Sequence, residues 1–540
     1  MSRKIACVLL SVLLALIYLV VFLLILPICP SLSSIALRNE LLSLAQEGLE
    51  WMMQFQITPP YYEWGWHTVC RDAWGGLAGY YIKGFKWAAA YGLESEYETY
   101  IASHDTGWFL ELSCKMYRLT RNEKYLKAAK LASEWCLRIQ VGYSDWFKEF
   151  RDFYVHVLRR GKEISWKVSS KGIIPPEETK GAFTEGMFFF SGLPPDFGEW
   201  GSGTNFAEPA MWIATEHVTP IVRGLIELYK ITGDNRYLQS AKRAVEWLLR
   251  MISEEGGVYT SYPPEVYGIR MGDTAATALV LFGIYDVTGN RTYLTTALRI
   301  CDYMLLKQNT NPESEAYGGL PHLSRAGGEW RINSYFTGDT AGAIRAWLEA
   351  YRRTGNYKYL YGINGTMKMP LGGAVLAADF LLRMQFTPLS RRWGNHKYWY
   401  DPRAWGGFIW AYSPTYGLVE YEFISTACGA VIALIDLYYE LPIEFSRKWM
   451  YLAAAELAYY WITRTDMYKS SNERNRVPGL TYYGDRYGLY KIGYLPFTGK
   501  YYNEVPTTMV GHEEQGFAVA MSVCPPLFMY LFLLEKLPSQ

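Results

Sequence analysis

An excess of charge of one sign is absent from this 540-residue chain, in which 53 Lys and Arg stand against 52 Asp and Glu. Proteins that bind nucleic acid need a basic surface to gather a polyanion, so nucleic acid is not an expected partner. Apolar residues make up 50% of the chain, which is ample for a large hydrophobic core. Aromatic residues reach 16%, so many rings are left over for the surface.

The chain also lacks the short motifs of metal sites and of several common enzyme classes. Its eight Cys include no CxxC pair and no Cys/His cluster, which argues against a structural zinc. His512-Glu-Glu-Gln-Gly does not match HExxH, and neither a Gly-x-Ser-x-Gly elbow nor a P-loop occurs. We therefore expect no metal and no cofactor, and we interpret the Cys on apolar helical faces as buried thiols.

Long apolar runs are scarce, and one stands out. Ile5 to Leu26 carries no charge, and as a helix it would span roughly 33 Å, enough to cross a bilayer. Arg3 and Lys4 precede it, so the N-terminus is expected in the cytoplasm and the rest of the chain outside. We expect residues 1–30 to be a single-pass membrane anchor and 31–540 to be one domain. The alternative is a cleaved signal sequence and a secreted protein, although no A-x-A-like cleavage site follows.

An internal repeat occurs four times and joins a turn to a Tyr-Leu pair. Its copies are Thr120–Ala129, Thr232–Ala241, Thr288–Ala297 and Thr354–Ile363. In three copies a Gly suits the left-handed residue that ends a helix, and the Asp or Asn after it can cap the next helix. Apolar residues then step by three and four, as in Leu238, Ala241, Val245 and Leu248. The repeat predicts tight turns between antiparallel helices.

The same alternation extends along most of the chain. Outer helices are predicted near 36–56, 122–140, 235–253, 291–308, 373–385 and 445–463. Inner helices, poorer in charge and richer in small residues, are predicted near 105–119, 216–231, 273–287, 339–353, 422–440 and 513–536. These segments make six helical hairpins, and 141–213 is long enough to hold a further element.

Six consecutive hairpins resemble the six-hairpin glycosidase superfamily, which includes sugar hydrolases, polysaccharide lyases and sugar epimerases. His104-Asp-Thr-Gly-Trp-Phe109 is similar to a stretch on the first inner helix of unsaturated glucuronyl and rhamnogalacturonyl hydrolases. The second acid of those enzymes would fall at the next inner helix, where this chain has Glu216-His217 and no Asp. The resemblance implies an all-α (α/α)6 toroid with long loops on one face, and a carbohydrate as substrate or ligand.

In such a toroid the loops that lead into the inner helices share one face with the free N–H groups of the helix ends. The candidate catalytic residues at these helix starts are His104, Asp105, His217, Asp339 and Glu513. A His beside an acid can act as a general acid or base near neutral pH. For Asp339 and Asp273 the alternative is helix capping, because an Asp-Thr pair recurs at three inner-helix starts.

Aromatic and polar residues of the long loops are the candidates for sugar binding. Rings with a polar edge can lie against the apolar face of a pyranose while neighbouring polar groups bond its hydroxyls. The candidates are Trp66, His67, Trp108, Trp200, Trp330, Trp393, Trp399 and Glu514. For any one ring, a structural contact within the loops is the alternative. Trp74-Gly-Gly and Trp405-Gly-Gly are similar to each other, which indicates a repeated turn.

Three functions are compatible with these features. The first is a membrane-anchored glycoside hydrolase outside the cytoplasm, which needs two carboxylates about 5 to 9.5 Å apart, such as Asp105 with Asp339 or Glu513. The second is a uronate lyase or C5-epimerase, with a base and a cation from the Tyr-rich stretch 482–502. The third is a non-catalytic glycan-binding or scaffold protein of the cell envelope, which the missing second Asp would favour.

Overall fold

A computed structural model gives the structure of the chain. It describes residues 35–67, 71–83, 97–143, 152–159, 162–169, 177–190, 206–210, 213–324, 331–387, 404–463, 480–483, 487–490, 493–495, 500–502 and 516–537. Within these residues no helix is long and apolar enough to cross a membrane. The predicted anchor at Ile5–Leu26 lies outside the described residues and stays a prediction.

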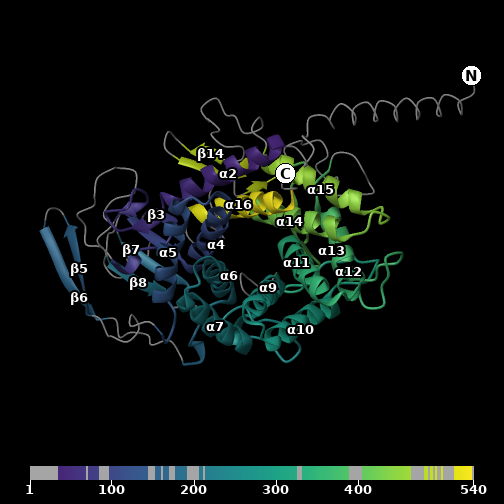
Figure 1. Ribbon diagram of the computed structural model, residues 1–540, viewed down its shortest axis with the longest axis horizontal. Helices are drawn as coiled ribbons and strands as arrows, with labels where there is room; N and C mark the ends of the chain where they lie inside the picture. Colours follow the sequence, from purple (N-terminus) through teal and green to yellow (C-terminus); the bar gives the residue numbers. More distant parts are fainter. Residues whose placement is uncertain are drawn as a thin grey trace, which may run out of the picture.

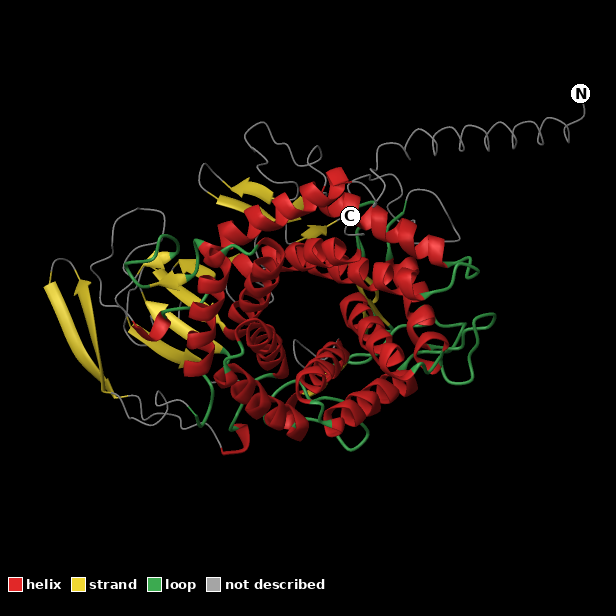
Figure 2. Ribbon diagram, in the orientation of Figure 1, coloured by secondary structure: helices red, strands yellow, loops and turns green. Residues whose placement is uncertain are grey.

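Two concentric rings of helices form a toroid (Figures 1 and 2). The inner ring consists of α4 (Ser103–Thr120), α6 (Thr215–Thr232), α9 (Met271–Thr288), α11 (Thr337–Thr354), α14 (Ile424–Glu440) and α16 (Val519–Lys536). The outer ring consists of α2 (Ile35–Met53), α5 (Glu123–Arg138), α7 (Asn235–Arg250), α10 (Arg291–Lys307), the short α12 (Lys358–Tyr361) with α13 (Gly373–Met384), and α15 (Lys448–Thr463). The predicted toroid of six hairpins is confirmed.

The domain is mostly helical rather than all-α, so that part of the prediction is wrong. One five-stranded sheet has the order β18-β3-β4-β7-β8, with β18 Gly516–Ala518, β3 Ala78–Lys83, β4 Tyr97–Ala102, β7 Gly186–Phe190 and β8 Phe206–Ala210. The other has the order β11-β12-β13-β16-β17, with β11 Tyr335–Phe336, β12 Ile409–Ser413, β13 Gly417–Phe423, β16 Gly493–Leu495 and β17 Lys500–Tyr502. The strands are rich in Tyr and Phe, which suit a pleated surface.

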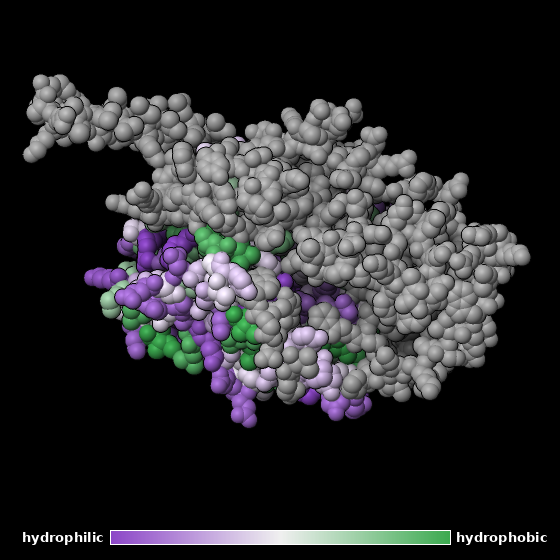
Figure 3. Space-filling view, turned by 180° about the vertical axis from the view of Figure 1, so that it is seen from behind, coloured by the Kyte–Doolittle hydropathy of each residue, from purple (hydrophilic) through white to green (hydrophobic). Residues whose placement is uncertain are grey.

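Both sheets lie on the face of the toroid where the inner helices begin. Four strands lead without a break into an inner helix: β4 into α4, β11 into α11, β13 into α14 and β18 into α16. The predicted start of the last inner helix at 513 is therefore wrong, because β18 occupies 516–518. We call this face the mouth of the toroid. In Figure 3, which views the molecule from behind Figure 1, hydrophilic and hydrophobic residues are intermingled where the chain is described.

The smaller strand pairs are peripheral. They are the hairpins β5 (Asp152–Arg159) with β6 (Lys162–Ser169) and β14 (Leu480–Tyr483) with β15 (Tyr487–Tyr490), and the short pairs β1 (Ile57–Thr58) with β2 (Trp66–His67) and β9 (Gly268–Ile269) with β10 (Leu323–Ser324). The hairpin of β5 and β6 stands out to one side of the rings in Figure 1. Together with β7 and β8 it provides the further structure for which segment 141–213 had room.

The turns between inner and outer helices have the predicted chemistry. Gly233, Gly289 and Gly355 end their helices in the left-handed conformation, with φ of 69°, 69° and 66°. Asp234 and Asn290 then accept a hydrogen bond from the N–H two residues on, which caps the next helix. The repeat therefore encodes the hairpin turns.

A second set of glycines lies in the segments that follow the outer helices. The sequence predicted only two of them. Gly75, Gly318 and Gly406 have φ of 99°, 88° and 100°. Each backbone passes so close to the next outer helix that an added Cβ would come within 1.9, 2.1 and 2.3 Å of a carbonyl oxygen. The repeated turn inferred from Trp74-Gly-Gly and Trp405-Gly-Gly is confirmed, because Gly75 and Gly406 have the same role.

Gly318→Ala is expected to lower the free energy of unfolding by about 3 kcal/mol, since it adds a steric clash to the strain of a positive φ. Gly233→Ala is the matched control: φ is also positive at 69°, but nothing lies within 4 Å of the added Cβ. It should lower the free energy of unfolding by only about 1 kcal/mol, the strain alone. Denaturant unfolding of both variants measures the difference, and equal losses would contradict the close approach at Gly318.

Candidate functional site

Polar side chains converge at the mouth, where four inner helices begin. His104 and Asp105 belong to the first turn of α4 and Glu216 and His217 to that of α6. Arg270 directly precedes α9, Asp273 lies in its first turn, and Asp339 lies in the first turn of α11. His322 comes from the segment between α10 and α11. The first turns of neighbouring inner helices meet around the axis, which brings these residues together.

Arg270 is at the centre of this group. Its guanidinium lies 2.5 Å from Glu216 Oε2, 4.0 Å from Asp273 Oδ1 and 4.0 Å from Asp339 Oδ1. One cation therefore faces three carboxyl groups from three helices. We call Glu216, Arg270, Asp273 and Asp339 the Arg270 cluster. Because one guanidinium cannot neutralise three ionised carboxylates in a buried place, the cluster favours retention of a proton by one of them.

The proton resides on Asp273. Burial, reinforced by the nearby charges of Glu216 and Asp339, raises the pKa of Asp273 to about 8 in spite of Arg270. Burial acts in the same direction on Glu216, but Arg270 and the two neighbouring imidazoles outweigh it and lower the pKa of Glu216 to about 2. Near neutral pH, Asp273 is therefore protonated and Glu216 is ionised, although both face the same guanidinium.

Asp339 is the second ionised carboxylate. Burial opposes its ionisation, but a hydrogen bond with His322, the charge of Arg270 and the Gly272 N–H hold the pKa of Asp339 below its usual range. The His322 Nδ1 atom lies 3.1 Å from Asp339 Oδ2. Asp273 Oδ2, by contrast, is buried without a hydrogen-bond partner in the protein. Asp273 and Asp339 therefore have the opposite protonation states that acid–base catalysis requires.

Gly272→Ala is expected to displace the Asp339 carboxylate, because the added Cβ would lie 2.5 Å from Asp339 Oδ1. A shift of about 1 Å at a catalytic group costs on the order of 100-fold in rate. Gly283→Ala on the same helix is the control, since its nearest neighbour would be 3.7 Å away. It should leave activity unchanged. Steady-state rates of the two variants make the comparison, and an active Gly272→Ala variant would count against a catalytic Asp339.

A pair of imidazoles lies beside the Arg270 cluster. The rings of His104 and His217 stack with centroids 5.3 Å apart and an interplanar angle of 14°. His104 Nε2 is 2.9 Å from Asp105 Oδ1, and Trp108 packs edge-on against the His104 ring. Burial tends to lower the pKa of His104, but Asp105, Glu216 and Glu185 raise it overall. Burial and the positive charges of His104 and Arg270 lower the pKa of His217 to about 3.

The capping interpretation of Asp273 and Asp339 is wrong. The cap residues of α9 and α11 are Arg270 and Phe336, and neither helix has a side-chain cap hydrogen bond. The structural member of the repeated Asp-Thr pair is the Thr. Thr274 Oγ1 donates to the Arg270 carbonyl and accepts from the Val258 N–H.

The other two copies use their Thr in the same way. Thr340 Oγ1 donates to the Phe336 carbonyl and accepts from the Leu320 N–H, and Thr106 bonds Ala102 and Leu77 likewise. Each hydroxyl thus ties the start of an inner helix to the segment before it. The neighbouring Asp is not needed for that bond and is available for chemistry.

The structure brings together four of the five predicted catalytic residues. His104, Asp105, His217 and Asp339 all lie at the mouth, with Trp108 beside them. The predicted partner of Asp339 was Asp105 or Glu513, whereas the structure pairs it with Asp273 around Arg270. The other predicted site residues lie outside the described residues or have side chains that the structure does not describe. They are Trp66, His67, Trp200, Trp330, Trp393, Trp399, Glu513 and Glu514.

Sequence reasoning missed Arg270 and His322, and it noted Glu216 without assigning it a role. A signal existed for Arg270: the residue before the other two Asp-Thr helices is Ala102 or Phe336, so a cation at this place is singular. Over the described part of the chain, no group of three or more His, Cys, Asp and Glu is placed to hold a metal ion. Five cysteines in the same part are buried free thiols, as expected.

Comparisons with known proteins define the fold and nothing finer. No protein-family model and no curated protein sequence matches the chain. Among solved structures, D-mannose isomerase matches with a TM-score of 0.56 at 10% identity, over 94% of this chain and 100% of that one. Cellobiose 2-epimerase from Bacillus thermoamylovorans B4167 matches with a TM-score of 0.53 at 12% identity, over 92% and 100% of the two chains. A sugar epimerase from a ruminal bacterium gives the same values. These matches show that the chain shares the fold of those structures, as the predicted toroid implies.

Proposed function

We propose that this protein is a carbohydrate-processing enzyme, and that glycoside hydrolysis is the reaction its mouth supports best. The observation that carries the proposal is the Arg270 cluster, in which Asp273 holds a proton near neutral pH while Asp339 is ionised. A glycosidase needs such a pair, one carboxylic acid to protonate the leaving oxygen and one carboxylate on the other side of the bond. Asp273 is the proposed acid and Asp339 the proposed base or nucleophile.

The spacing of the two groups is compatible with this role. Asp273 Oδ1 and Asp339 Oδ1 each lie 4.0 Å from a nitrogen of the Arg270 guanidinium. The two are therefore no more than about 10 Å apart, a limit that includes the separations of retaining and inverting glycosidases. Asp273 would give its proton to the glycosidic oxygen as the bond to the anomeric carbon breaks. Asp339 would activate the attacking water or bond to that carbon, and His322 and Arg270 keep Asp339 ionised before it reacts.

The solved structures that share the fold support an enzyme of carbohydrates, since their titles name a mannose isomerase and two sugar epimerases. A scaffold that had lost its chemistry would gain nothing from a buried, protonated Asp273 beside an ionised Asp339. Such an arrangement destabilises the folded chain at neutral pH. The opposed carboxyl groups thus favour an enzyme over a non-catalytic glycan-binding protein.

The stacked imidazoles favour a second candidate, proton transfer at a carbon atom of a sugar. The pKa of His104 is raised, which makes this ring the stronger base, and that of His217 is lowered to about 3, which keeps this ring neutral. His104 could take a proton from the carbon beside a sugar carbonyl group while the neutral His217 donates a hydrogen bond to the carbonyl oxygen. This reaction would give an epimerase or isomerase, and a uronate C5-epimerase is its acidic-sugar form.

The deciding experiment is an activity screen of the purified full-length chain on neutral and uronate oligosaccharides. Hydrolysis predicts release of new reducing ends, and proton transfer in D₂O predicts deuterium at carbon without chain cleavage. Unsaturated products absorbing in the ultraviolet would identify a lyase. Asp286→Asn, at the far end of α9 from Asp273, is the matched control and should keep full activity. If no glycan is cleaved, isomerised or labelled, the proposal of an enzyme is wrong.

A further inference from the structure

The face opposite the mouth carries an exposed apolar rim. It consists of Tyr357, Ile363, Met369, Tyr439, Ile443 and Trp449. The exposed fraction of these side chains runs from 47% to 72%: Ile443 is 72% exposed, Met369 61% and Trp449 50%. Large apolar side chains grouped on one surface mark an interaction site rather than chance exposure.

Ring contacts join the elements that carry the rim residues. The buried rings of Tyr361, the last residue of α12, and Phe445, between α14 and α15, lie 6.3 Å apart. The Tyr357 and Tyr361 rings stack at 6.0 Å. Tyr438 connects Trp449 to Tyr439 through edge contacts of 5.4 and 5.3 Å. The elements that carry the rim, from the end of α11 to the start of α15, are therefore packed together.

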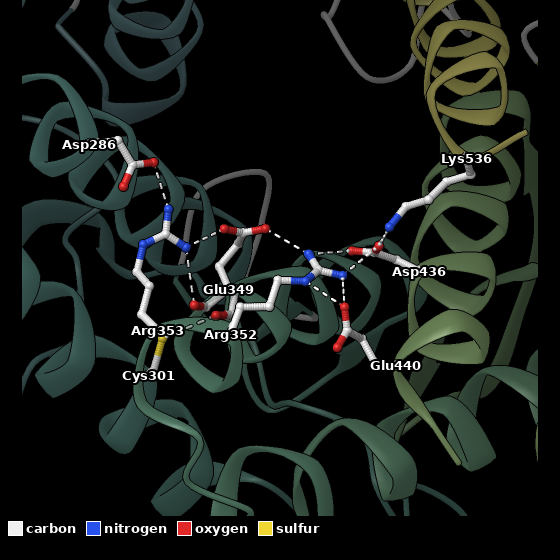
Figure 4. Close-up of polar contacts among 9 residues, drawn as sticks. Asp286, Cys301, Glu349, Arg352, Arg353, Asp436, Glu440 and Lys536 are labelled. Carbon is white, nitrogen blue, oxygen red and sulfur yellow. Dashed lines mark hydrogen bonds and ion pairs between the residues drawn. The ribbon is translucent and has the colours of Figure 1, made fainter. Parts of the chain in front are cut away.

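Ion pairs fix the helix ends beneath this rim (Figure 4). Arg352 at the end of α11 binds Asp436 and Glu440 of α14, at 2.7 and 2.5 Å. Lys536 at the end of α16 binds Asp436 at 2.6 Å, and its ammonium lies 5.8 Å from the centre of the Tyr439 ring. Three inner helices thus end on one charged network, which holds Tyr439 and its neighbours in place.

The first described helix begins at this same face. Arg38 of α2 donates a hydrogen bond to the Leu534 carbonyl near the end of α16, at 3.0 Å. The sequence before α2 contains the uncharged run Ile5–Leu26, followed by eight residues before Ile35. Eight residues can extend over at most about 28 Å, so a membrane crossed by that run would lie close to the face on which the rim is exposed.

We propose that the apolar rim rests on the membrane surface and that the mouth faces away from it. Trp and Tyr side chains suit the headgroup region because one part of each is apolar and the other polar. Exposed Lys368, next to Met369, can reach lipid phosphates. The inner helices have up to 18 residues, which sets the mouth about 27 Å farther from the bilayer than the rim. Substrates then reach the site from the solvent side.

The two ends of α14 provide a matched test. Ile443 follows the helix and Tyr416 precedes it on the mouth side, and their exposures are 72% and 70%. Ile443→Cys and Tyr416→Cys would be labelled with an NBD fluorophore in the full-length chain. Each variant would then be reconstituted into nanodiscs with and without brominated lipid. Labelling of native cysteines is subtracted with the wild-type chain, and circular dichroism checks that both variants are folded.

The proposal predicts roughly a twofold or greater loss of NBD emission at position 443 with brominated lipid, and little loss at 416. Equal emission with and without brominated lipid at both positions would overturn it. Quenching at 416 alone would show that the mouth faces the membrane, which would overturn it as well. The result is independent of any enzymatic activity, so it stands or falls separately from the proposed function.

Discussion

Arg270→Ala is expected to lower the free energy of unfolding by about 3 kcal/mol at pH 7, because it leaves Glu216, Asp273 and Asp339 without their shared cation. Activity should be lost as well. Without Arg270 the carboxyl groups take up protons more readily, so the deficit in stability should shrink as the pH falls from 7 to 5. Denaturant unfolding of the wild type and the variant at the two pH values measures this dependence.

Arg270→Lys is the control for charge. An ammonium keeps the positive charge but not the planar fork that reaches Glu216 and lies beside the other two carboxyl groups. It should therefore recover part of the stability lost in Arg270→Ala. An alanine variant as stable as the wild type at both pH values would show that the three carboxyl groups do not depend on this guanidinium.

Asp273→Asn is expected to reduce kcat by about 10²- to 10⁴-fold, the usual contribution of a general acid, with little change in stability below pH 4. Asn resembles the protonated carboxyl group in shape and charge, and below pH 4 Asp273 is protonated in the folded and the unfolded chain alike. A loss of kcat without a loss of stability therefore reports the missing acid and not damage to the fold. Rates and denaturant unfolding of the same preparation give both quantities, and a fully active variant would exclude Asp273 as the acid.

Asp273 also makes stability depend on pH in a definite direction. Its pKa is raised in the folded chain from an ordinary value of 3.8 to about 8, so between these values the folded state holds a proton that the unfolded state has released. Stability from this group is therefore full below pH 4 and is lost as the pH rises towards 8. Asp273→Asn removes the dependence, so its advantage in stability over the wild type should grow as the pH rises from 4 and level off above pH 8.

The helical framework could be predicted because its signals are local. A left-handed Gly followed by a capping Asp or Asn marks a turn within four residues, and Gly233 with Asp234 shows that chemistry in the structure. The outer helices α7 and α10 begin at their predicted starts, 235 and 291, for the same reason. The strands were missed because their aromatic residues, as in Gly186–Phe190, lay in segments interpreted only as loops for sugar binding.

The site could be predicted only in part because its partners are distant in the sequence. Asp339 and Arg270 are 69 positions apart and meet only when two inner helices are side by side. The recurrence of Asp-Thr was assigned to the wrong residue, since Thr274 and Thr340 make the structural bonds. No local sequence pattern distinguishes an Asp that belongs to the site from a Thr that holds the helix start. The buried position of Asp273 and Asp339 around Arg270 does.

The pH dependence of kcat/KM for glycan cleavage tests the central claim most directly. The account predicts a rate that is steady from about pH 5 to 7 and falls above pH 8, as the free enzyme loses the Asp273 proton. In the Asp273→Asn variant the residual rate should lack that fall. A wild-type rate that stays constant through pH 9, or a variant with the same falling limb, would contradict the assignment of Asp273 as the catalytic acid.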